Sequence, residues 1–242
     1  SSDSTTEVEP FWPRRTELAI EWKVAQLLGR QSRQLSAAPV DVEAILETRA
    51  ALRLEIVAGL IPHFSVEACV VEQRGTATLY VDRIVADSRP IASYRQLLAR
   101  CAALWLLNPA CSTAADSARY FSALREHNYW PQMVRDCERF SLALMLPATP
   151  ILGAAESVYR ELVLNEGWVE LEVAARTIRN RLAEQFAVPP ALVQRRLMGW
   201  PCHLYGRVAQ ALAAEELTLP PSDWLFEALP ERQRTLFELG TQ

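Results

Sequence analysis

The spacing of apolar residues predicts helices over most of the chain. Between residues 15 and 31 the apolar positions recur at helical intervals, and Gly29 stands near their end as a stop signal. A second helix is expected after Pro39, with Asp41 as its N-cap. The chain is therefore expected to begin with two helices, the first of them amphipathic.

Strand-like sequence follows these helices. The stretch 52–60 (LRLEIVAGL) and the stretches 69–72 and 76–81 are rich in β-branched and apolar residues, and the letters QRG between the last two indicate a hairpin turn. We expect two or three antiparallel strands. The almost wholly apolar stretch 94–109 (YRQLLARCAALWLLNP) then predicts a buried helix that carries one permanent cation, Arg100.

Helical patterns return after this stretch. An amphipathic helix is expected over 112–127 and a strongly apolar one over 131–147, where Pro147 stops it. Further helices are expected up to residue 201, and the last two are separated by a short turn with Val188 and two prolines. This arrangement is typical of a helix-turn-helix, and equally of a helical hairpin that only packs.

These elements predict an α+β protein that is mostly helical, with a small antiparallel sheet packed on the apolar helix and a helical C-terminal region. We divide the chain into a flexible tail (1–14), a domain (15–150), a helical region with the helix-turn-helix-like segment (151–206) and a C-terminal extension (207–242). The extension alternates prolines with short apolar segments, which suits wrapping around the body or docking a partner.

The net charge and the cysteine content limit the classes of function that the chain is expected to have. The net charge of −4 gives no global basic field that would favour nucleic acid or an anionic membrane. The five cysteines are an odd number without CxxC spacing, which indicates reduced thiols in a cytoplasmic protein. No signal peptide and no uncharged run of eighteen apolar residues is visible in this sequence.

Several segments resemble the ImmA/IrrE-type zinc metallopeptidases, in the order expected of that family. Residues 95–108 (RQLLARCAALWLLN) fit its active-site helix, which reads roughly RFTLAHELGHLLLH, without a gap. The stretches 39–45 (PVDVEAI) and 79–83 (LYVDR) resemble its early helix and the strand before the active-site helix. The stretches 136–147 (DCERFSLALMLP) and 182–197 (LAEQFAVPPALVQRRL) resemble its third-ligand helix and the helix-turn-helix-like segment that follows.

The resemblance implies that the catalytic residues are lost. Arg100 stands at the first zinc histidine, Cys101 at the general-base glutamate and Leu104 at the second zinc histidine, while Asp136 stands at the third ligand, a glutamate in the family. Zinc proteolysis needs imidazole ligands and a carboxylate base, which arginine, leucine and a thiol do not supply. We therefore expect no catalytic residues, no metal and no cofactor.

Arg100 suggests a replacement for the metal. We hypothesise an ion pair between Arg100 and Asp136 in the place of the cation, and on this basis expect Arg100→Ala to destabilise the protein more than Arg95→Ala. The alternative is that the Arg100 stem packs while its guanidinium reaches solvent.

Two rebuilt sites are weaker alternatives. Cys101, Asp136, Cys137 and His127 could form a cryptic metal site, and Cys101 could act as a nucleophile with His127 as base. Buried thiols are more often core residues.

The helix-turn-helix-like segment offers a different function. Its second helix is expected to begin near Pro190 and to present Gln194, Arg195 and Arg196, with three more arginines on the preceding helix, Arg176, Arg179 and Arg181. Such a cluster can contact DNA, or be a solvated helix face. The preferred function is a non-catalytic family member that binds a protein partner. Because the family's peptidases typically cut transcriptional repressors, the resemblance implies a transcriptional regulator as a candidate partner. DNA binding is the second hypothesis and an enzyme with a rebuilt site the third, with no membrane partner expected.

Overall fold

The computed structural model describes residue 12 and residues 15–29, 39–107 and 131–221. Its elements follow the order α1 (Glu17–Leu28), α2 (Val42–Arg49), β1 (Leu52–Val57), α3 (Leu60–Phe64), β2 (Ala68–Gln73), β3 (Thr76–Asp82), α4 (Arg83–Ser88), α5 (Ile91–Leu107), α7 (Pro131–Met145), α8 (Ala148–Glu166), α9 (Leu171–Gln185), α10 (Pro190–Met198) and α11 (Leu204–Ala213). The predicted α+β class with a predominance of helix is confirmed. The predicted tail 1–14 and the predicted helix 112–127 lie almost entirely outside the described residues.

The beginnings of the first helices follow from local sequence. The Thr16 hydroxyl accepts a hydrogen bond from the Ala19 amide at 3.2 Å, and the Asp41 carboxylate accepts one from the Ala44 amide at 3.0 Å. Each side chain satisfies an amide that has no partner within its helix. Gly29 ends α1 with a φ of 55°, a conformation that favours glycine.

The sheet is mixed rather than antiparallel, which corrects the prediction. β2 and β3 form the expected hairpin, and its two turn residues, Arg74 and Gly75, both have positive φ angles. β3, however, also pairs with β1 in parallel and lies between the other two strands. The alternation of apolar residues determines which face of a strand is buried, but it does not determine the direction of the neighbouring strand.

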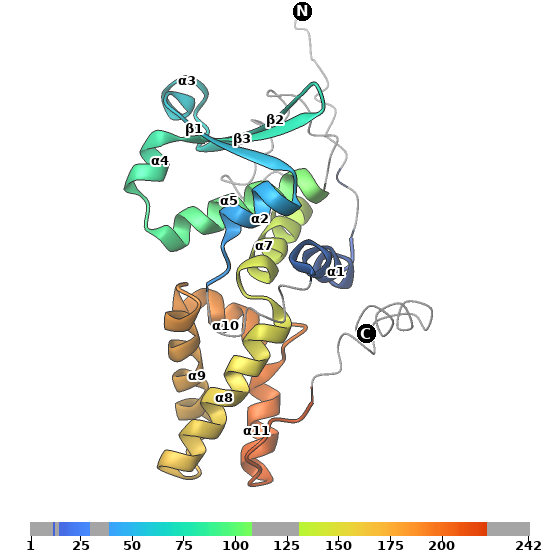
Figure 1. Ribbon diagram of the computed structural model, residues 1–242. Coiled ribbons are helices and arrows are strands. Elements are labelled where there is room, and N and C mark those ends of the chain that lie inside the picture. Colours follow the sequence, from blue (N-terminus) through green and yellow to red (C-terminus); the bar gives the residue numbers. More distant parts are fainter. Residues whose placement is uncertain (1–11, 13–14, 30–38, 108–130, 222–242) are drawn as a thin grey trace, which may run out of the picture.

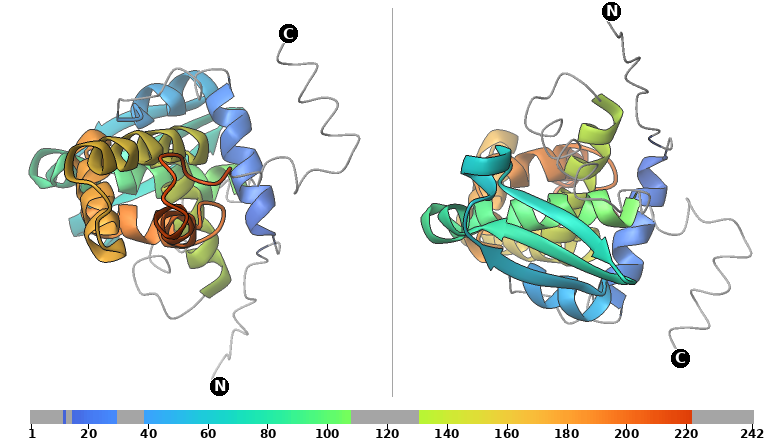
Figure 2. Two further views of the ribbon diagram at one scale, coloured as in Figure 1. Left: turned by 90° about the horizontal axis from the view of Figure 1, so that it is seen from below. Right: turned by 90° about the horizontal axis from the view of Figure 1, so that it is seen from above.

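The sheet forms one layer over α5 and α2, and α7 packs beneath α5 (Figures 1 and 2). The side chains of Leu79 and Val70, which face each other across β3 and β2, are buried. The other end of the molecule consists of α8, α9, α10 and α11 (Figure 1). Buried apolar side chains form one core that includes residues from both ends, so the two ends share their interior.

The predicted boundaries at 150 and 206 fall inside α8 and α11, respectively. In the described part of the chain, no single helix is long and apolar enough to cross a membrane, and only α7 and α8 together, bent by 57° at their break, reach the required length and composition.

Candidate functional site

The four positions matched to the peptidase site lie on two packed helices. Arg100, Cys101 and Leu104 are on α5, and Asp136 is on α7, which packs along α5. The side chains of Cys101, Leu104 and Asp136 are buried, with exposed fractions of 0%, 2% and 0%. Arg100 is half-buried. At these positions the interface between α5 and α7 is filled by side chains.

Asp136 is bound by the N-terminal part of the chain and by its own helix. Its carboxylate accepts hydrogen bonds from the Trp12 indole at 2.9 Å and from the Gln132 amide at 2.8 Å. Arg15 lies over the Trp12 ring, with its guanidinium carbon 5.6 Å from the ring centroid, and donates to the Leu107 carbonyl. Burial lowers the pKa of Arg15, and the nearby charge of Asp136 opposes this effect.

The hypothesis of an Arg100–Asp136 ion pair is not supported by this geometry. Within the described residues, the hydrogen bonds that Asp136 accepts come from Trp12 and Gln132 rather than from Arg100. An indole and an amide are neutral donors, so Asp136 is satisfied mainly by hydrogen bonds and by the neighbouring charge of Arg15.

The arginine that α5 holds most firmly is Arg95. Its side chain is 8% exposed and donates to three backbone carbonyls, at 2.9 Å to Val40 and at 3.2 Å to both Phe186 and Ala187. Val40 precedes α2, while Phe186 and Ala187 lie in the turn between α9 and α10. Arg95 thus connects the two ends of the molecule. The sequence did not predict this role, because every residue has a backbone carbonyl and the side-chain pattern does not show which carbonyls an arginine will contact.

The cysteines near the matched site are buried thiols. Burial raises the pKa of Cys101 well above its ordinary value, and the nearby charge of Arg100 only partly opposes this. A thiol in this state is a poor nucleophile because the reactive form is the thiolate. His127, the other member of the rebuilt sites, lies outside the described residues. Among residues 12, 15–29, 39–107 and 131–221, no group of three or more His, Cys, Asp and Glu side chains is arranged to hold a metal ion.

The helix-turn-helix-like segment forms as predicted, with α10 beginning at Pro190. Gln194 and Arg195 are exposed, but Arg196 is 5% exposed and therefore does not belong to the expected basic surface. Arg195 is also paired, with its guanidinium donating to Glu138 of α7. α10 packs against α7, and this packing turns Arg196 inward.

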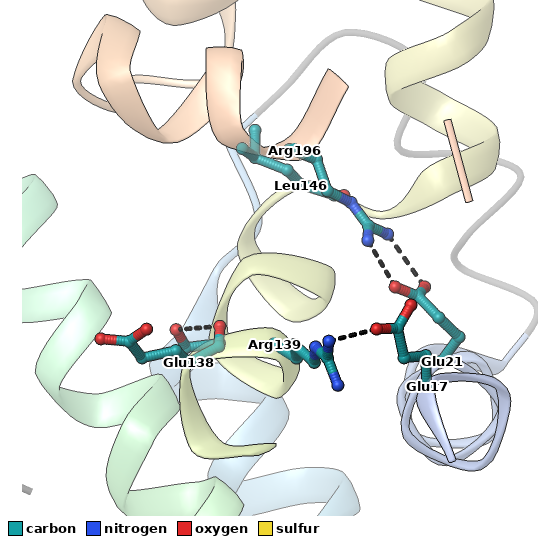
Figure 3. Close-up of polar contacts among 7 residues, drawn as sticks. Glu17, Glu21, Glu138, Arg139, Leu146 and Arg196 are labelled. Carbon is teal, nitrogen blue, oxygen red and sulfur yellow. Dashed lines mark hydrogen bonds and ion pairs between the residues drawn. The ribbon is translucent and has the colours of Figure 1, made fainter. Parts of the chain in front are cut away.

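Arg196 forms a buried ion pair with Glu21 of α1 (Figure 3). Its two terminal nitrogens donate to the two carboxylate oxygens of Glu21, one of them at 2.9 Å, and its Nε donates to the Leu146 carbonyl at 2.9 Å. Burial acts to lower the pKa of Arg196, but the charge and hydrogen bonds of Glu21 raise it. A second pair, Arg139 with Glu17, joins α7 to α1 at the surface.

An open groove lies between α9, α10 and α11. Its volume is about 380 Å³, and its lining residues are Glu172, Ala175, Arg176, Arg179, Gln194, Leu197, Met198, Leu204, Tyr205 and Val208. The interior is apolar, since Leu197, Leu204 and Val208 are buried, while Met198 and Tyr205 are exposed by 56% and 41%.

The charge of the groove comes mainly from α9. Arg176 is exposed, and Arg179 donates to Gln194 at 3.3 Å from across the groove. The sequence singled out the arginines but gave no signal for Met198 and Tyr205, because only the packing of α11 brings these residues together. The groove combines an apolar interior with two arginines and one glutamate, Glu172, on the α9 side.

Comparison of the chain with models of protein families, with curated proteins and with solved structures finds no match.

Proposed function

We propose that this protein is a non-catalytic relative of the ImmA/IrrE-type metallopeptidases that acts by binding another protein. The buried state of Cys101, Leu104 and Asp136 supports the non-catalytic part of the proposal. A peptide bond would have to reach these positions to be cut, and the side chains between α5 and α7 occupy that space. The residue types at the same positions lack the ligands and the base of a zinc peptidase.

The groove between α9, α10 and α11 is the observation that carries the binding proposal. Met198 and Tyr205 are exposed to solvent beside a buried apolar interior. Covering this surface with a partner is favourable, because it removes apolar area from water. Methionine adapts to different partner shapes, and tyrosine is enriched at protein interfaces. Arg176 and Arg179 at the edge favour a partner segment that carries carboxylates beside its apolar residues.

DNA binding is less well supported by the same surface. A DNA-binding helix must present basic and polar side chains to the phosphates and the base edges. On α10, Arg196 is buried against Glu21, and Arg195 is exposed but paired with Glu138. Of the three residues expected to contact DNA, Gln194 is exposed, but it carries no charge to bind a phosphate. The apolar interior of the groove also fits a protein segment better than a polyanion.

A peptide-display selection on the purified 242-residue chain tests this proposal. We expect enrichment of peptides that combine aromatic or aliphatic residues with Asp or Glu. Their binding should be lost with Met198→Asp in the groove and retained with Leu164→Asp on α8, a matched control because Leu164 is 65% exposed and does not line the groove. Peptides that bind both variants equally, or salt-dependent retention on DNA that is lost with Arg176→Glu, would contradict the proposal.

Elemental analysis tests the non-catalytic part separately. We expect substoichiometric metal in the tag-free protein and no peptide cleavage after addition of zinc. Near-stoichiometric zinc that a chelator removes together with a cleavage activity would establish an enzyme with unusual ligands.

A further inference from the structure

A cleft lies between α8 and α9, which pack side by side (Figure 1). Its volume is about 910 Å³, and it is lined by α8 from Thr149 to Glu161 and by the last turns of α9, including Arg181. A Cβ atom placed on Gly153 would meet nothing within 4 Å, so the middle of the cleft is open. Arg179, which lines the groove, lies on the opposite side of α9, because successive helical residues are about 100° apart. The cleft and the groove are therefore separate surfaces.

Exposed apolar side chains continue the cleft toward the connection between α8 and α9. Leu164 lies on the same face of α8 as Ser157, two turns away, and it is 65% exposed. Trp168 in the connection and Val173 in the first turn of α9 are 46% and 39% exposed. Large apolar side chains that are exposed together beside an open cleft are typical of a binding surface.

The charge around these apolar side chains is negative. Residues 161–175 contain four glutamates and no basic residue. One of the four, Glu161, is paired with Arg181 at 2.7 Å. Glu166 and Glu170 are exposed and form no ion pair with a described residue. A partner that covers this end of the cleft must therefore bring basic side chains to its rim, because carboxylates there would be repelled.

The length and the floor of the cleft suit a helix. From Thr149 to Leu164, α8 rises by about 22 Å, which equals the length of another helix of about 15 residues. Gly153 and Ser157 are small and exposed, so the axis of a second helix can approach α8 closely. An amphipathic helix also presents apolar residues on one face and charged residues at its flanks, which matches the apolar end of the cleft and its acidic rim.

We propose that the cleft between α8 and α9 binds a basic amphipathic helix of a second protein. The apolar face of that helix covers Leu164, Trp168 and Val173, and its lysine or arginine side chains pair with Glu166 and Glu170. The charge of this partner is opposite to the charge expected of a partner in the groove. The inference therefore concerns a further interaction and does not depend on the proposed function.

A labelled model peptide of about 15 residues, with leucine and lysine at helical spacing, tests this surface on the purified 242-residue chain. Fluorescence anisotropy at physiological salt measures its dissociation constant. Gly153→Leu fills the cleft without a change in charge and should weaken binding about tenfold or more. Gly206→Leu on α11 is the matched control, because Gly206 also has open space at its Cβ position but does not line the cleft. Both variants should fold, since leucine favours a helix more than glycine does.

Leu164→Asp separates apolar contact from attraction by charge. It should weaken binding of the leucine–lysine peptide about tenfold, because an apolar contact is lost. Attraction by charge alone predicts stronger binding, since the variant adds a carboxylate. Met198→Asp in the groove should leave binding of this peptide unchanged.

Three results would overturn the proposal. The first is that the unmutated chain does not bind the peptide, and the second is that the Gly153→Leu and Gly206→Leu proteins bind it equally. The third is a dimer, detected by sedimentation, that Gly153→Leu dissociates, because a second copy of the chain would then occupy the cleft. The peptides selected for the groove should bind the Gly153→Leu protein normally, so failure of this proposal and failure of the proposed function are distinguishable.

Discussion

Arg196 of α10 and Glu21 of α1 form a two-contact ion pair in the interior, although 175 residues separate them in the sequence. Each side chain is at most 8% exposed, so neither charge can be satisfied by water if the other is removed. The pair joins the first helix of the chain to the helix-turn-helix-like segment, and the Leu146 carbonyl binds the same guanidinium at the junction of α7 and α8. This contact fixes the position of α10 and thereby one wall of the groove.

Glu21→Ala should destabilise the protein by about 3–5 kcal/mol, since it leaves the Arg196 charge buried without its partner. Glu17→Ala is the matched control, because Glu17 lies one turn away on the same helix and its pair with Arg139 is 40% exposed on both sides. Loss of this exposed pair should cost about 0–1 kcal/mol. Urea unfolding of both variants measures the difference, and similar small losses would show that the buried pair contributes little.

Arg95→Ala should destabilise the protein by about 3 kcal/mol or more, because three backbone carbonyls lose a charged donor, and two of these hydrogen bonds are buried. Hydrogen bonds from charged groups contribute about 1.5–3 kcal/mol each, not additively. Arg53→Ala serves as the control, since the Arg53 side chain is 69% exposed in its pair with Glu55. Thermal or urea unfolding gives both values. An Arg95→Ala protein as stable as the control would mean that water replaces the lost donor.

Trp12→Phe should cost about 1–3 kcal/mol, because the buried Asp136 carboxylate loses the indole hydrogen bond while the aromatic ring is kept. Trp168→Phe is the control. Trp168 is 46% exposed, so loss of its indole should have little effect on the free energy of unfolding. Urea unfolding followed by circular dichroism avoids interference from the loss of tryptophan fluorescence. Equal stability of the two variants would show that residue 12 does not hold Asp136 in solution.

Protonation of Asp82 should lower the free energy of unfolding at acid pH. The Ile61 amide, which donates to its carboxylate at 3.0 Å, is the main cause that lowers the pKa of Asp82, and the Ile84 amide at 2.8 Å adds to this against the opposing effect of burial. Because the pKa is lowered in the folded state, the ionised carboxylate contributes fully to the free energy of unfolding at pH values above the ordinary pKa near 3.8. This contribution is lost as the pH falls through the pKa of the folded state.

Urea unfolding at pH 7 and at pH 3 measures this contribution. The loss of stability between the two values should be smaller in Asp82→Asn than in the unmutated protein, because asparagine does not titrate. An identical loss in both proteins would assign the acid sensitivity to other carboxylates.

The local sequence was sufficient to predict much of the secondary structure. The cap Asp41, the stop at Gly29, the hairpin at Arg74 and Gly75 and the start of α10 at Pro190 depend on residues within a few positions of one another. Their hydrogen bonds and φ preferences are local, so the sequence determines them without reference to the rest of the molecule. The assignment of Arg100, Cys101 and Leu104 to the positions of zinc-peptidase catalytic residues rests on the resemblance alone and stays a prediction.

Tertiary structure decided the direction of β1, the roles of the arginines and the existence of the groove. A strand pattern has no direction, so the parallel pairing of β1 with β3 follows only from the path of the chain through α3. Arg95 and Arg196 differ from exposed arginines only by what packs around them: three carbonyls in one case and Glu21 in the other. The groove exists because α11 brings Tyr205 beside Met198 of α10 and Arg176 of α9, and contacts between separate helices depend on packing rather than on the pattern within any one of them.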